Sequence, residues 1–217
     1  MTRRNAPDEQ LAFDIDALIH EADVRTAPAW EGAPLHFTTA YWTPEQLTAA
    51  FDRWTFEHGR FDSLRTSHMW HPAVTMEHAN ANTTGHDLRV FSVDLRCHHY
   101  RERCSCMGDL LYRAICHNCA WHHDGTESQI VAAWHDHAWP GWRELPIIPI
   151  TIAKTDDQNR PTTKCLEWIT EHYPTDWQTS GAPVITERVP HGTRSVPGRS
   201  PWSGFDLSHT LLNCNPN

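Results

Sequence analysis

Two closely spaced pairs of cysteines are the feature of this sequence that most limits what the chain can fold into. One residue separates Cys104 from Cys106, two separate Cys116 from Cys119, and nine lie between the pairs. Four thiolates at this spacing can converge on one tetrahedral ion, and thiolate sulfur selects zinc over calcium or magnesium. The spacing therefore predicts a zinc-ribbon-like module with Cys104, Cys106, Cys116 and Cys119 as the zinc ligands.

Two histidines downstream leave a second ligand set open. His135 or His137 could be the fourth ligand beside Cys106, Cys116 and Cys119. Both histidines fall in a predicted helix, where residues two apart differ by about 200° in direction, so they do not bind one ion together. Either set supplies four protein ligands, and a zinc site closed in this way is structural rather than catalytic.

Charge and cysteine usage exclude several classes of protein. A net charge of -9 argues against a chain whose main task is to coat nucleic acid. The first ten residues, MTRRNAPDEQ, lack the apolar stretch of a signal peptide, and no run is long and apolar enough to span a bilayer. We therefore expect a cytoplasmic protein without a membrane partner. In that reducing setting, clustered cysteines are metal ligands more often than disulfides.

The order of the segments indicates an α+β fold with a central zinc-ribbon-like module and an extended Pro/Gly-rich C-terminal tail. We divide the chain into an N-terminal helical segment, an α+β region, the zinc-binding module, a linker with a helix, and the tail. In that order the boundaries are 1–30, 31–95, 96–145, 146–173 and 174–217.

Local patterns place the elements inside these segments. Apolar residues at helical spacing predict a helix from Asp8 to Val24, and Thr43-Pro44-Glu45 begins a second helix that ends near His58. Further helices are expected within 61–76 and over 126–138 and 162–172. Strands are expected over 35–41, 88–95 and 110–115, the last in a short hairpin that returns the chain to the metal.

Two segments are candidate partner-binding sites. Gln10 and Phe13 stand in a glutamine-leucine-aromatic stretch that resembles the short peptides with which bacterial proteins dock to the sliding clamp, although an amphipathic helix start explains the same residues. Arg194 and Arg199 lie near aromatic residues in the tail, and such interleaving can follow a nucleic-acid backbone. An arginine-rich tail laid on an acidic body explains them equally well.

A second group of histidines keeps an enzymatic alternative open. His68 and His71 are separated by three residues and would share one face of a helix, as a metal-binding pair would, and His58 lies nearby. With the pair His135 and His137, these are the residues that a metal-dependent nuclease or hydrolase would use. No HExxH motif accompanies them, so hydrogen-bonded or surface histidines explain them as well.

The wording of three segments resembles a known family. CSCMGDLLYRAICHNCAW, HDHAWPGWRELP and GTRSVPGRSPWSGFD are similar, over roughly Cys97 to Asp206, to an uncharacterised zinc-ribbon-like family of actinobacteria, their plasmids and their bacteriophages. The resemblance implies a mobile-element context and assigns no catalytic residue. We therefore expect a zinc-stabilised accessory protein that binds a host protein or nucleic-acid-processing machinery, rather than an enzyme. The alternatives are the metal-dependent nuclease or hydrolase and a DNA-binding zinc-finger protein.

Overall fold

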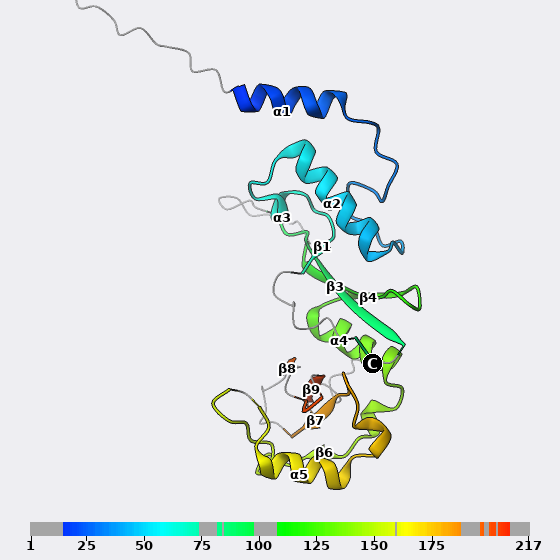
Figure 1. Cartoon of the computed structure of the whole chain (residues 1–217), viewed down its shortest axis with the longest axis vertical. Helices are drawn as coiled ribbons and strands as arrows, with labels where there is room; N and C mark the ends of the chain where they lie inside the picture. The colour runs from blue at the N-terminus through cyan, green and yellow to red at the C-terminus, as the bar shows by residue number, and fades with distance from the viewer. Residues whose placement is uncertain are drawn as a thin grey trace, which may run out of the picture.

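Helices and two sheets form a stack of layers along the long axis of the molecule (Figure 1). The computed structural model describes residues 15–73, 82–83, 85–97, 108–158, 160–187, 196–197, 200–202 and 204–208. From one end to the other, the layers are α1 and α2, the first sheet, α4, the second sheet and α5 (Figure 1). The mixed α and β composition confirms the coarse fold class expected from the sequence.

The first sheet is antiparallel and contains the two longest strands that the structure describes. Its members are β1 (His71–Pro72), β2 (Asn82–Thr83), β3 (His86–Asp94), β4 (Leu110–Cys116) and β5 (Trp121–Gly125). The order is β1-β3-β4-β5, and β2 pairs with the beginning of β3. In the β3–β4 register Leu88 lies opposite Cys116, and in the β4–β5 hairpin Cys116 lies opposite Trp121. The strands expected over 88–95 and 110–115 are confirmed.

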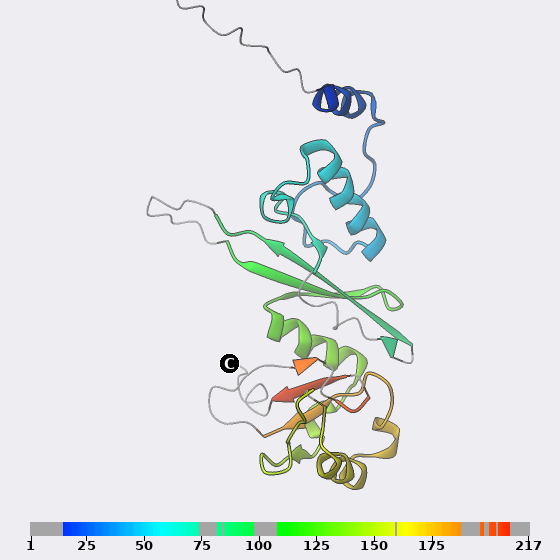
Figure 2. The same cartoon turned by 60° about the vertical axis from the view of Figure 1, so that its left-hand side comes forward.

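Each face of this sheet packs against a helical layer, because successive side chains of a strand point to opposite sides. Phe91, Val93 and Ile115 are buried on the face toward α2 (Pro44–His58). Leu88 and Val90 are buried on the other face, together with apolar residues of α4 (Glu127–Ala138). Two views show β3 and β4 crossing between these two helices (Figures 1 and 2).

The second sheet is smaller and mostly parallel. It contains β6 (Ile147–Ile148), β7 (Val184–Thr186), β9 (Phe205–Ser208) and β8 (Val196–Pro197), in this order. β6, β7 and β9 are parallel, and β8 is antiparallel to β9. The short helices η2 (Trp142–Glu144) and η3 (Thr175–Trp177) and the helix α5 (Thr163–His172) complete this half. Apolar residues of α4, α5 and the second sheet belong to one buried cluster with Leu88 and Val90.

Three helices begin where the sequence predicted. Thr43 caps α2, and its side chain accepts a hydrogen bond from the backbone of Gln46. Thr126 caps α4 in the same way, and Thr162 precedes α5. The short helix expected within 61–76 is α3 (Ser63–Thr66). The N-terminal helix is described from Ile15 to Thr26 as α1, and the earlier part of that prediction lies outside the described residues.

The strand predicted over 35–41 is wrong. This segment has no regular structure, because its carbonyl groups accept hydrogen bonds from side chains rather than from a neighbouring strand. The Thr38 carbonyl accepts from the Trp70 indole and the Arg113 guanidinium, and the Ala40 carbonyl accepts from Arg113. Among the described helices, none combines the length and the apolar character that crossing a bilayer requires.

Candidate metal centre

Four side chains with metal-binding atoms meet where the first sheet reaches α4. They are His86, Cys116, Cys119 and His137, and one ligand atom from each lies within 4.8 Å of the others. His86 is the first residue of β3, Cys116 is the last residue of β4, Cys119 lies in the turn before β5, and His137 lies in the last turn of α4. The site thus joins three elements of the fold.

The register of β3 and β4 brings the first two ligands together. Leu88 lies directly opposite Cys116, so both side chains point toward α4. His86 precedes Leu88 by two residues and shares its face, which places the imidazole beside the turn after β4. The backbone N–H of His117 donates to the Asp87 carbonyl at 3.2 Å, and the Asn118 side chain donates to the Gly85 carbonyl at 3.3 Å.

Helix α4 supplies the fourth ligand. Trp134 is buried in the core, and its ring meets the edge of the His86 ring at a centroid distance of 6.0 Å. His137 lies three residues further on the same side of the helix. The indole of Trp121 stacks on the His137 ring, with centroids 4.5 Å apart and planes 4° apart. Packing of two tryptophans therefore fixes the direction of both imidazoles.

The distances inside the group match those of a tetrahedral zinc site. His86 Nδ1 lies 3.6 Å from Cys116 Sγ and 3.5 Å from Cys119 Sγ. In a tetrahedron with Zn–S of about 2.3 Å and Zn–N of about 2.0–2.1 Å, the sulfur–nitrogen edge is about 3.6 Å. The three atoms therefore stand where an ion between them would hold them.

Protonation and hydrogen bonding also fit a cation. The hydrogen bond with Cys116 raises the pKa of the Cys119 thiol, and burial and the charge of Cys116 act in the same direction. Burial lowers the pKa of His137, and the neighbouring His86 lowers it further, so the imidazole is held neutral and can donate a lone pair. His137 Nε2 is buried and has no hydrogen-bond partner within the described part of the chain. A metal ion would satisfy this atom.

Three of the residues singled out from the sequence belong to this group: Cys116, Cys119 and His137. Cys104 and Cys106 lie outside the described residues, so their part in metal binding stays a prediction. His135 points elsewhere, because its side chain is fully buried and its Nδ1 lies 2.7 Å from the Val131 carbonyl. Burial lowers the pKa of His135 to about 4, and its ring packs against Trp142 and Phe205.

His86 was not identified from the sequence. It lies 30 residues before Cys116 and stands alone, without a neighbouring cysteine or histidine at metal-binding spacing. The available signal was indirect. Given the hairpin of residues 110–125 and the alternation of Leu88–Leu95, an antiparallel pairing of the two segments would have placed the start of the earlier strand beside the Cys116–Cys119 turn.

The second histidine group does not come together as a metal site. His71 lies on β1 rather than on a helix with His68, because α3 ends at Thr66 and His68 has a positive φ of 47°. His68 Nδ1 lies 2.8 Å from the Asp94 carbonyl, and the His58 ring stacks on Trp54. Within the described ranges, the only group suited to a metal is the one that contains His86.

The predicted partner-binding residues Gln10, Phe13, Arg194 and Arg199 all lie outside the described residues. The tryptophans near the metal centre, which were candidates for a recognition surface, are largely used in packing. Trp142 is buried, and Trp139 packs against Trp177.

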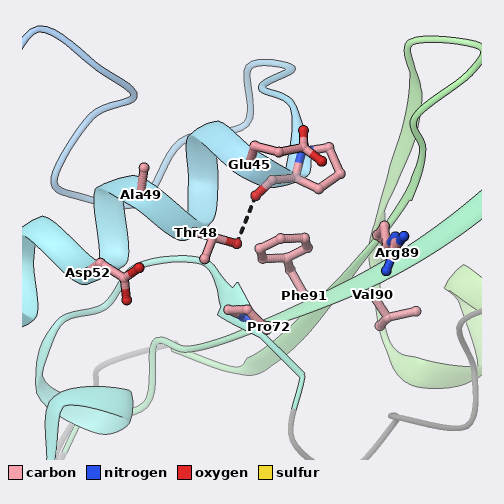
Figure 3. A pocket seen from close by; sticks show the side chains of 9 residues that line it. Glu45, Thr48, Ala49, Asp52, Pro72, Arg89, Val90 and Phe91 are labelled. Carbon is pink, nitrogen blue, oxygen red and sulfur yellow. Dashed lines mark hydrogen bonds between the residues drawn. The ribbon is translucent and has the colours of Figure 1, made fainter.

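A cleft of about 510 Å³ lies near the metal centre, between α2, β1 and β3. Figure 3 shows Glu45, Thr48 and Asp52 on the α2 side and Arg89 on β3. Arg89 is already paired with Asp87 at 3.2 Å, and Glu45 lies 3.5 Å from His117 in the metal-site turn. The cleft therefore carries charges of both signs and connects α2 to the turn between Cys116 and Cys119.

Comparison with known proteins gives one match. A family model described as "Family of unknown function (DUF6349)" matches residues 32–217, so the chain belongs to this family. The matched residues include all four members of the metal group and exclude α1. Comparison with curated proteins and with solved structures gives no match.

Proposed function

We propose that this chain binds one zinc ion through His86, Cys116, Cys119 and His137. The observation that carries the proposal is the pair of sulfur–nitrogen distances, 3.6 and 3.5 Å, which match the edge of a zinc tetrahedron. Two thiols and two imidazoles form a soft ligand set, which suits zinc and not calcium or magnesium. The orphaned His137 Nε2 supports the same assignment.

The role of the zinc is structural. Four protein ligands close the coordination sphere and leave no position for a substrate or an activated water. When bound, zinc supplies the positive charge that keeps both thiols as thiolates. The residues of the chain do the rest: they tie the start of β3 and the β4–β5 turn to the last turn of α4.

A closed site supports action by binding rather than by catalysis. In keeping with the wording of its segments, we propose a cytoplasmic accessory protein of a bacteriophage or mobile element from actinobacteria, which binds a host protein or nucleic-acid-processing machinery. In this proposal Gln10 and Phe13 serve a sliding clamp, and Arg194 and Arg199 serve nucleic acid. The two ends of the chain would thus provide contacts while the metal holds the middle.

The test is the zinc content of the full chain purified under reducing conditions, measured by elemental analysis. We expect one zinc per chain, and loss of most of it in Cys119→Ser and in His86→Ala. Cys106→Ser and His123→Ala are matched controls, because each removes a residue of the same type from outside the group. Both controls should keep their zinc.

A different result separates the competing ligand sets. If Cys106→Ser loses zinc while His86→Ala keeps it, four cysteines hold the ion and the Cys₂His₂ assignment is wrong. If none of the purified proteins contains zinc, and added zinc does not bind to the reduced chain, the proposal fails as a whole.

A further inference from the structure

Helix α1 presents an apolar stripe that nothing in the described structure covers. Ile15, Leu18 and Ile19 are exposed by 66%, 55% and 55%, and their spacing puts them on one face of the helix. No residue of α1 is buried. An isolated helix of this length is marginal in water, so α1 gains stability only when its stripe is covered.

An apolar cleft lies directly beside this helix. It has a volume of about 790 Å³ and runs between α1, α2 and α3. Phe51, Phe56 and Leu64 line it, and His20 of α1 closes one side with its ring at the edge of Phe56, at a centroid distance of 5.5 Å. Phe61 follows α2 and is 97% exposed. Stripe and cleft therefore lie at the same end of the molecule (Figure 1).

The charges of the helix and of the cleft are opposite. Asp16 and Asp23 on α1 have no ion-pair partner among the described residues, whereas Glu21 is paired with Arg25 at 2.8 Å. Arg60 lines the cleft and also lacks an ion-pair partner there. An acidic helix and a cleft with a free guanidinium attract each other when they come from different molecules.

We propose that this end of the chain binds a second copy of itself, with α1 of each copy lying in the cleft of the other. A two-fold axis beside α1 satisfies both stripe–cleft contacts at once, because an isologous interface uses the same patch twice. The charge pattern favours this occupant, since Asp16 and Asp23 of one copy meet Arg60 of its partner. The contact goes beyond the metal site, and α1 lies outside the residues that the family model matches.

Sedimentation velocity of the full, zinc-loaded chain over a range of concentrations tests the proposal. We expect a concentration-dependent dimer that Leu18→Asp weakens by more than about tenfold, because the interface would have to bury a carboxylate. Leu166→Asp is the matched control: Leu166 is 37% exposed on α5, at the far end of the molecule. This control should dimerise like the original chain.

Charge reversal tests the orientation of the contact. Arg60→Glu, and separately Asp16→Lys with Asp23→Lys, should each weaken the dimer, and the combination of all three should restore it. Phe61→Ser is a second apolar variant that leaves α1 untouched and should also weaken association. Circular dichroism and zinc content of every variant show that the fold is intact.

Two results would overturn the proposal. One is a chain that stays monomeric at every concentration, which would leave the stripe to a different protein. The other is a dimer that persists in both Leu18→Asp and Phe61→Ser, which would place the interface elsewhere.

Discussion

Arg113 shows how much one side chain decides in this fold. It is fully buried on β4, and its guanidinium makes a two-pronged ion pair with Asp124 on β5, at 2.6 and 2.7 Å. It also donates to the carbonyls of Thr38 and Ala40 and lies over the Trp70 ring at 4.5 Å. One arginine therefore holds the irregular segment before α2 against the first sheet.

Replacing Arg113 by alanine should destabilise the chain by about 3–5 kcal/mol, because it breaks a buried ion pair and leaves two carbonyls without donors. The measurement is urea unfolding followed by circular dichroism. Arg160→Ala is the matched control, since the pair of Arg160 with Asp156 is on the surface. An equal loss in both variants would show that the Arg113 contacts add nothing beyond a surface pair.

At the scale of elements, the helix caps explain why three helices were located correctly from the sequence. Thr126 Oγ1 accepts from the Gln129 backbone at 3.4 Å, and the Gln129 side chain accepts from the Thr126 backbone at 2.8 Å. Thr162 occupies the same position before α5 but makes no such side-chain bond. A threonine at a helix start thus stabilises its helix only where the side chain reaches the free N–H groups.

Thr126→Ala should therefore cost about 1 kcal/mol in unfolding free energy, and Thr126→Ser should restore most of it. Thr162→Ala is the control, and we expect a clearly smaller loss because no capping bond is removed. Thermal unfolding of the three variants beside the original chain measures the difference. Equal losses at Thr126 and Thr162 would contradict the capping assignment.

At the scale of the whole molecule, α4 lies between the two sheets and packs with both (Figure 2). The metal group binds the end of this helix to the first sheet, so the proposed zinc fixes the position of α4 and of the layers beyond it. The face of the first sheet toward α2 has its own buried cluster, which contains none of the four ligands.

Removal of zinc by a chelator should lower the melting temperature and change the tryptophan fluorescence, because Trp121 stacks on His137 and Trp134 meets His86. Metal return should reverse both changes. Cys119→Ser should show neither response, since it has no site to empty. A chelator that strips the zinc without moving the melting temperature would mean that the ion contributes no stability.

Sequence reasoning was most successful where neighbouring residues decide the outcome. The cap at Thr43, the alternation of Leu88–Leu95 and the pair Cys116 and Cys119 are local patterns, and each is found in the structure as an element or a ligand pair. The second sheet was missed because its described strands contain two to four residues, too few to show a period. Their partners are also far apart in the chain.

The sequence by itself determined that α4 and the β4–β5 hairpin form, and that two thiols stand at a turn. Only the tertiary structure decided which imidazoles join them. His86 meets Cys116 through the register of two strands, and His137 rather than His135 faces the site because packing sets the rotation of α4. Strand register and helix rotation depend on contacts between distant residues, so no local pattern encodes them.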